Sequence, residues 1–92
     1  MSINVDDILA ERGSRYGNYL EQTTISGELR RCMDFWVKEK GTKLAHDQAD
    51  SLVMIAVKIS RIINGDPDYA DNWRDIAGYA TLVADRLEGK SR

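Results

Sequence analysis

The sequence predicts an all-α protein, a small antiparallel bundle of about four helices that assembles into an oligomer. The chain has one proline and no clear alternation of apolar and polar residues, so strands have little support. Apolar residues instead recur at spacings of three and four along its longer segments. The run "IAGYATLV" is apolar on nearly all sides of a helix, which calls for cover on two faces and therefore for a second subunit.

The first two helices are expected before residue 41. A short helix should begin near Val5, with Asp6 and Asp7 in its first turn, where acidic side chains suit the positive end of the helix dipole. It should end in the glycine-containing turn 13–17. A longer helix then covers residues 19–40 and is closed by a glycine. Its apolar stripe consists of Ile25, Leu29, Cys32, Met33 and Trp36.

Two further helices are expected after residue 45. The third covers about residues 46–63 and ends at Asn64 and Gly65. Its stripe consists of Leu52, Ile55, Ala56, Ile59 and Ile63. The fourth begins at Asp66 or just after it, with Pro67 suited to the first helical position, and continues to about residue 87.

Composition limits the classes of protein to consider. With 92 residues the chain is expected to form one domain, 1–92, with a flexible tail from about 88 to 92. The net charge of -2 argues against a mainly electrostatic nucleic-acid binder, so direct nucleic-acid binding is not expected. A single cysteine, no signal peptide and no membrane span indicate a cytoplasmic protein without a membrane partner.

Acidic residues lie at a fixed spacing on the fourth predicted helix. At 100° per residue, Asp71 and Asp75 share one side with Gly78 and Leu82. Two carboxylates at i and i+4 can share a divalent cation, and a glycine leaves room for a ligand. Solvated acids that stabilise the helix through its dipole are the alternative. Tyr79 lies beside them and suits packing against a partner chain better than catalysis.

The third predicted helix carries a charged edge. Its acids, Asp47 and Asp50, come first, and its bases, Lys58 and Arg61, follow. A magnesium–phosphate ligand needs this order of oxygen ligands and cationic donors, and Met54 lies between the two groups. Ordinary capping and dipole interactions are the alternative explanation of the same charges.

The segment "ERGSRYG" holds two arginines and a tyrosine between glycines. Arg12 and Arg15 could close over a phosphate, and Tyr16 could stack on a base. The same residues could instead simply anchor a turn.

Three blocks of sequence, "ILAERGSRYG", "MIAVKISRIINGDPDYADNW" and "RDIAGYATL", resemble small all-α proteins of phages and prophages. The last two also look like a remote branch of the MazG-like NTP pyrophosphohydrolases and dimeric dUTPase-like enzymes. That resemblance implies helical bundles that form dimers or tetramers and hold magnesium on acidic residues against a nucleoside polyphosphate. No ExxE pair of the enzymes occurs here, so the acid set is altered.

Two functions from different classes follow as expectations. The first is a phage-encoded nucleotide-binding protein that either hydrolyses a nucleoside polyphosphate with Mg²⁺ or sequesters a host nucleotide. Its metal ligands would be Asp47, Asp50, Asp71 and Asp75, and its phosphate contacts Lys58, Arg61, Arg12 and Arg15. The second is a counter-defence protein, such as an anti-CRISPR inhibitor, that binds a host defence protein without catalysis. A structural or assembly protein is a third possibility.

Overall fold

The computed structural model describes residues 4–90 and contains four α-helices within them, with no strand in that range. The helices are α1 (Val5–Tyr16), α2 (Tyr19–Lys40), α3 (His46–Asn64) and α4 (Ala70–Leu87). The predicted all-α, four-helix bundle is therefore confirmed. None of these helices is long and apolar enough to cross a membrane, in the part of the chain that the structure describes.

Local sequence explains where the first two helices begin and end. The side chains of Asn4 and Asn18 accept hydrogen bonds from the backbone N–H groups of Asp6 and Glu21, at 2.8 and 3.0 Å. Each bond satisfies a donor that the first helical turn leaves without an intrahelical partner. At the other end of α2, Gly41 takes the left-handed conformation (φ 64°) that commonly closes a helix.

Two predicted boundaries were wrong. The segment 13–17 is not a turn, because α1 continues through Gly13 to Tyr16 and only Gly17 has a positive φ, of 78°. The fourth helix starts at Ala70 rather than near Asp66, because Asp66 organises a turn instead. Its backbone carbonyl accepts from the N–H of Tyr69, and its side chain accepts from the N–H of Asp68.

The first residues after α4 make backbone contacts with that helix. The backbone N–H of Lys90 donates to the carbonyl of Asp85 at 2.8 Å, and Gly89 has a φ of 81°. Residues 88–90 thus cap the helix, whereas residues 91 and 92 lie outside the described residues.

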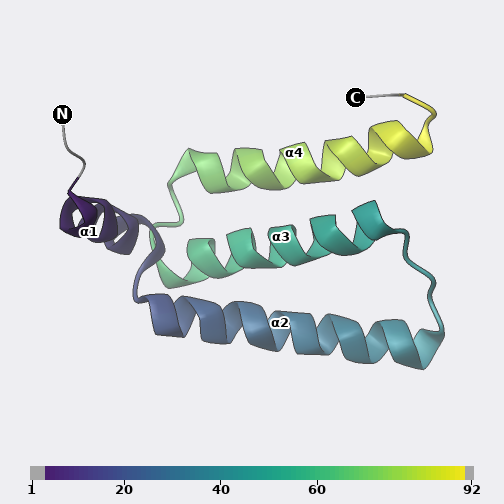
Figure 1. Ribbon diagram of the computed structural model, residues 1–92, viewed down its shortest axis with the longest axis horizontal. Coiled ribbons are helices and arrows are strands. Elements are labelled where there is room, and N and C mark those ends of the chain that lie inside the picture. Colours follow the sequence, from purple (N-terminus) through teal and green to yellow (C-terminus); the bar gives the residue numbers. More distant parts are fainter. Residues whose placement is uncertain (1–3, 91–92) are drawn as a thin grey trace.

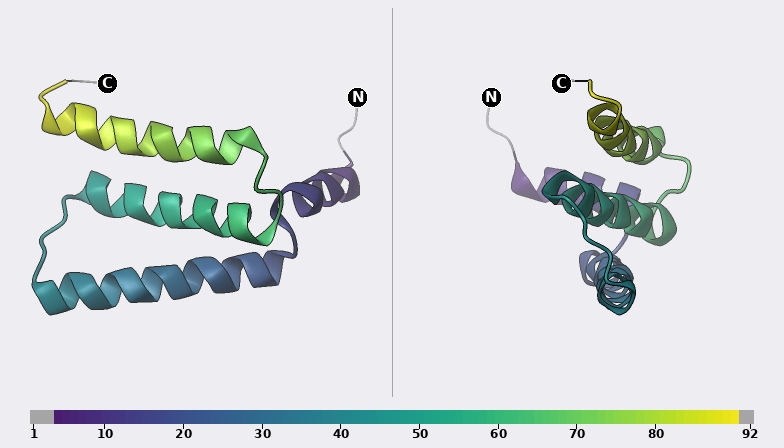
Figure 2. Two further views of the ribbon diagram at one scale, coloured as in Figure 1. Left: turned by 180° about the vertical axis from the view of Figure 1, so that it is seen from behind. Right: turned by 90° about the vertical axis from the view of Figure 1, so that its right-hand side faces the viewer.

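Helices α2, α3 and α4 form a single layer with α3 in the middle (Figure 1). Each of the other helices packs against α3, whereas α2 and α4 do not touch. Seen from the side, the three helices lie one above another (Figure 2, right). Arg86 near the end of α4 bonds to Asp47 at the start of α3, so these two ends lie side by side.

Two loops cross where α1 meets α3. The side chain of Asn64 donates to the backbone carbonyls of Tyr16 and Asn18 at 3.0 and 2.9 Å, and the N–H of Asp66 donates to the carbonyl of Arg15 at 2.7 Å. A Cβ on Gly17 would collide with the backbone of Asn64, and one on Gly65 would collide with the backbone of Arg15. The crossing therefore requires both glycines.

The core of this layer is small. Ala56 and Ile62 are its buried apolar residues, at 2% and 9% exposure. A polar contact accompanies them, since Gln22 of α2 donates to the hydroxyl of Ser60 on α3 at 2.9 Å and both residues are buried. Because the pair is satisfied, it fixes the position of α2 along α3 without leaving an orphaned polar group.

Candidate functional site

An arginine–tyrosine cluster lies where α1, α3 and the loop before α4 meet. It consists of Arg12, Arg15, Tyr16, Arg61 and Tyr69. The guanidinium carbon of Arg61 lies 4.4 Å from the centre of the Tyr16 ring, and that of Arg15 lies 4.2 Å from the centre of the Tyr69 ring. Arg12 also lies over Tyr16, at 5.7 Å. The two rings are 6.4 Å apart, so the contacts form one continuous group.

The cluster holds positive charge that neighbouring acids do not neutralise. The Nε atoms of Arg15 and Arg61 are buried, and neither has a hydrogen-bond partner among the described residues. Arg15 makes only a long contact of 3.8 Å with the exposed side chain of Glu11. Aromatic rings attract cations through their faces but leave the guanidinium N–H groups free to donate elsewhere. The cluster is thus suited to an anion.

Two connected hollows adjoin the cluster. The tyrosine hollow, of about 490 Å³, is lined by Leu9, Arg12, Gly13, Tyr16, Gly17, Tyr19 and Gln22. The arginine hollow, of about 330 Å³, is lined by Arg12, Tyr19, Gln22, Thr23, Ser26, Gly27, Arg30, Val57 and Arg61. They share Arg12, Tyr19 and Gln22 and form one groove between α1, α2 and α3. No carboxylate is among these lining residues, so the groove is positively charged.

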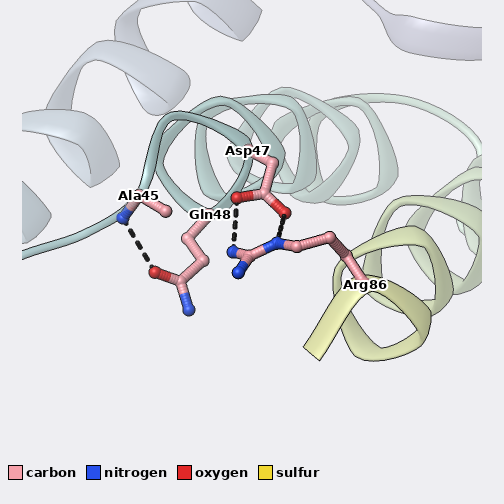
Figure 3. Close-up of polar contacts among 4 residues, drawn as sticks. All are labelled: Ala45, Asp47, Gln48 and Arg86. Atoms are coloured by element: carbon pink, nitrogen blue, oxygen red, sulfur yellow. Dashed lines mark hydrogen bonds and ion pairs between the residues drawn. The ribbon is translucent and has the colours of Figure 1, made fainter. Parts of the chain in front are cut away.

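Asp47 is held by an arginine rather than open to a metal. Arg86 donates two hydrogen bonds to its carboxylate, from Nε at 2.8 Å and from an Nη at 2.6 Å (Figure 3). This paired geometry is the strongest form of arginine–carboxylate contact. The hydrogen bond from Arg86 holds the pKa of Asp47 below its ordinary value of 3.8. Beside it, Gln48 accepts from the backbone N–H of Ala45 and caps α3.

The two acids of α4 also have partners. The Nζ of Lys58 lies 2.8 Å from Oδ2 of Asp75, and the lysine side chain is only 11% exposed. The hydroxyl of Tyr69 donates to Oδ2 of Asp71 at 2.9 Å, and this bond raises the pKa of Tyr69 above its ordinary value of 10.0. Lys58, predicted as a phosphate contact, is therefore paired with an acid and does not line the groove.

A third hollow lies between the start of α3 and the end of α4. It measures about 510 Å³, and its lining includes the predicted site residues Asp47, Asp50, Met54, Tyr79 and Leu82, together with Arg86 and Lys90. Asp71 and Asp75 do not line it. Gly78 faces open space, since a Cβ there would meet no atom within 4 Å.

The four predicted metal ligands do not meet in one chain. Asp50 lies near the Asp47–Arg86 pair, whereas Asp75 lies opposite Lys58, eight residues along α3 and so about 12 Å away at 1.5 Å per residue. Within residues 4–90 no group of three or more acidic, histidine or cysteine side chains is placed to hold a metal ion. The carboxylates of one chain thus do not fit a magnesium ion, and we derive no reaction step through one.

Several site residues were not predicted from the sequence. Tyr69, Arg30, Tyr19 and Gln22 join the cluster or line the groove only because α1 and α2 both pack beside the end of α3. The one available signal was that Arg12 and Arg15 flank Tyr16 in the segment "ERGSRYG". Nothing in the local sequence indicated that Arg86 would bind Asp47, because the two residues are far apart in the chain.

Comparison with known proteins places the chain in a family. No curated protein and no solved structure matches it. A family model does match, over residues 5–87, which include all four helices and every residue of the cluster. The chain therefore belongs to the family described as "Domain of unknown function (DUF6378)".

Proposed function

We propose that this protein binds a nucleotide or a nucleotide-like phosphate ligand in the groove between α1, α2 and α3. The observation that carries the proposal is the convergence of three arginines from two helices on two neighbouring tyrosine rings, with two buried Nε atoms left unpartnered. Arg12 and Arg61 lie over Tyr16, and Arg15 lies over Tyr69. We propose further that it is an antiparallel helical bundle that acts as a homo-oligomer in the cytoplasm of an infected bacterial cell, in keeping with its resemblance to phage proteins.

The two hollows of the groove suit the two parts of such a ligand. Arg30 and Arg61 line the arginine hollow and offer guanidinium donors, which match phosphate oxygens in pairs. Tyr16 lines the tyrosine hollow and offers its ring face to a base. Arg12 and Tyr19 line both hollows and can contact either part of the ligand. Each hollow lies in the size range of small-molecule sites, roughly 300–1,000 Å³.

Sequestration is better supported than hydrolysis. Hydrolysis by the MazG-like route needs water activated by Mg²⁺ on Asp50, Asp71 and Asp75, and these acids are separated or paired within one chain. Such a site would need carboxylates from another chain as well. Binding through arginines needs no metal, which makes a nucleotide-sequestering protein the simpler proposal.

Isothermal titration with a panel of nucleoside mono-, di- and triphosphates, with and without Mg²⁺, tests this function. We expect binding that tightens with the number of phosphates and persists when EDTA replaces Mg²⁺. Failure of every nucleotide to bind would reject the proposal. Release of pyrophosphate or phosphate from a bound nucleotide would show an enzyme rather than a sequestering protein.

A second candidate function is binding to a host defence protein, and one observation favours it. Phe35 and Trp36 form an edge-to-face pair on α2, with ring centres 5.1 Å apart, and are 58% and 51% exposed. Exposed aromatic pairs of this kind are enriched at protein interfaces. The double variant F35S/W36S should then lose a stoichiometric partner that the wild-type chain recovers from host lysate, while nucleotide binding is kept.

A further inference from the structure

The chain as a whole, α1 included, exposes more surface than a folded chain of its size should. Its accessible surface is 6987 Å², whereas a monomer of 10.4 kDa is expected to expose about 5,400 Å². Its radius of gyration is 15.6 Å, against about 12 Å for a compact chain of this length. About 1,600 Å² per chain is therefore left for something else to cover.

One side of the layer, which we name the apolar face, exposes large apolar side chains on α3 and α4. On α3 the helical period places Leu52, Ile55, Ile59 and Ile63 on one side, with Leu52 and Ile63 39% and 66% exposed. On α4 the matching side has Trp73, Ile76, Ala80, Val83 and Leu87, with Trp73 and Leu87 55% and 60% exposed. A shallow, almost wholly apolar hollow of about 300 Å³, lined in part by Leu52, Ile55, Ala80 and Val83, joins the two helices.

Helix α2 continues the apolar face. One side of α2 lines the arginine hollow beside Arg61 and so belongs to the groove. Its residues there are Thr23, Gly27 and Arg30. The helical period puts Ile25, Leu29, Cys32 and Trp36 on the other side. Trp36 is 51% exposed and Cys32 is also exposed, so a host protein bound at the Phe35–Trp36 pair would compete with a second copy of this chain for this end of α2. The apolar face thus extends across three helices, opposite the groove.

We propose that a second copy of this chain covers the apolar face, forming a two-fold dimer in which the two layers stack face to face. The uncovered area of about 1,600 Å² per chain, or about 3,200 Å² for two chains, lies within the range of obligate homodimers, which bury about 2,000–5,000 Å² in total. Apolar side chains from all three helices make up this face, as in the buried centre of a permanent interface, and Lys40 lies at its edge over the Trp36 ring.

A second copy fits this face better than a different partner. The layer buries few apolar residues of its own, Ala56 and Ile62, so its apolar face has to be covered whenever the chain is folded. A second copy is always present where the chain is made, whereas a different partner is not. In a two-fold interface the same patch serves both subunits, so an apolar face can match itself. Stacking the layers would also create the two-layer core that small helical domains require.

The mass of the full chain in solution tests the dimer. Light scattering coupled to size exclusion should give about twice 10.4 kDa for the wild type. Leu52→Glu places one charge per chain on the apolar face and should raise the dimer dissociation constant at least about 100-fold. The matched control, Leu82→Glu, changes a 51% exposed leucine on the groove side and should keep the dimer.

Cys32 provides a readout that does not depend on a variant. In the dimer its thiol is covered, so reaction with a thiol reagent should slow at least tenfold as the wild-type concentration rises through the dissociation constant. A monomeric mass at millimolar concentration would overturn the proposal. So would a dimer whose Cys32 reacts at the rate of the monomer, or one that Leu82→Glu dissociates and Leu52→Glu does not.

The test is separate from that of nucleotide binding. Arg61→Ala, on the opposite side of α3, should leave the dimer mass unchanged. Loss of nucleotide binding with an intact dimer would therefore count only against the proposed function, and a monomer that binds nucleotide would count only against the dimer.

Discussion

Lys58 reaches from α3 to Asp75 on α4 with 2.8 Å between Nζ and Oδ2, and its own side chain is 11% exposed while that of Asp75 is 47% exposed. The lysine is thus a largely buried charge with its partner at the surface. Asp75→Asn would leave the ammonium group without a counter-charge, so we expect the free energy of unfolding to fall by about 1–2 kcal/mol, discounted for the exposure of the acid. Urea denaturation at fixed protein concentration measures it.

Lys58→Met is the matched variant for this pair. It removes the buried charge and keeps the length of the side chain, so its cost in free energy should be small or absent. If Lys58→Met is as destabilising as Asp75→Asn, the ion pair itself stabilises the protein. A metal role for Asp75 would instead require Asp75→Asn to change Mg²⁺ binding.

Stability should depend on Asp47 in acid. Because Arg86 lowers the pKa of Asp47 in the folded state below the ordinary value of 3.8, the pair stabilises the fold above about pH 4. That contribution disappears as pH falls through the lowered pKa. The melting temperature of the wild type should therefore drop faster between pH 4 and pH 2 than that of Asp47→Asn, which cannot titrate. Parallel curves for the two proteins would show that the pair contributes nothing.

Substitution of a glycine in the crossing loops should lower the free energy of unfolding. In Gly17→Ala the new Cβ meets the backbone of Asn64 at a φ of 78°, so we expect a loss of about 1–3 kcal/mol in the free energy of unfolding. Gly78→Ala is the control, because its Cβ meets nothing within 4 Å inside a helix, and it should stabilise the protein by roughly 0.5–1 kcal/mol. Equal effects of the two substitutions would contradict the crossing.

Removing one arginine of the cluster should weaken nucleotide binding. Arg61→Ala deletes a cation shared by the cluster and the arginine hollow, and the loss of one charge-assisted contact corresponds to about 10–100-fold in the dissociation constant. Arg74→Ala removes a guanidinium that is 79% exposed on α4, outside the groove, and should change affinity less than twofold. Titration of a nucleoside triphosphate into each variant separates a specific site from general charge attraction.

The sequence predicted the helices better than the partners of their charges. Periodicity and capping residues located α2 and α3 to within a residue, because those signals are local. Gly13 was misinterpreted because a glycine in a helix costs only about 1 kcal/mol, which the packing of Tyr16 and Arg15 offsets. Pro67 was a sound start signal, but Asp66 and Tyr69 form a turn that delays the helix.

The site could be predicted only in part, for a related reason. Placing residues at 100° each around a helix put four charged residues on the correct helices: Asp47, Lys58, Asp71 and Asp75. That placement could not show which part of α4 lies beside each charged residue of α3. Arg86 and Lys58 take Asp47 and Asp75 as partners because of how α3 and α4 align, which depends on the length of the loop and the packing of both helices. A charge pair 39 residues apart leaves no local signal.

The crossing of the two loops also bears on the order in which the molecule comes apart. Helices α2, α3 and α4 are joined by short loops and contact their neighbours in sequence, so they can reform quickly from local contacts. Helix α1 has no buried residue, and the N–H of Asp66 reaches back to Arg15 across about fifty residues of chain. Its amides should therefore exchange with deuterium first, and with the detachment of α1 the groove loses Arg12 and Tyr16 while the rest of the layer persists.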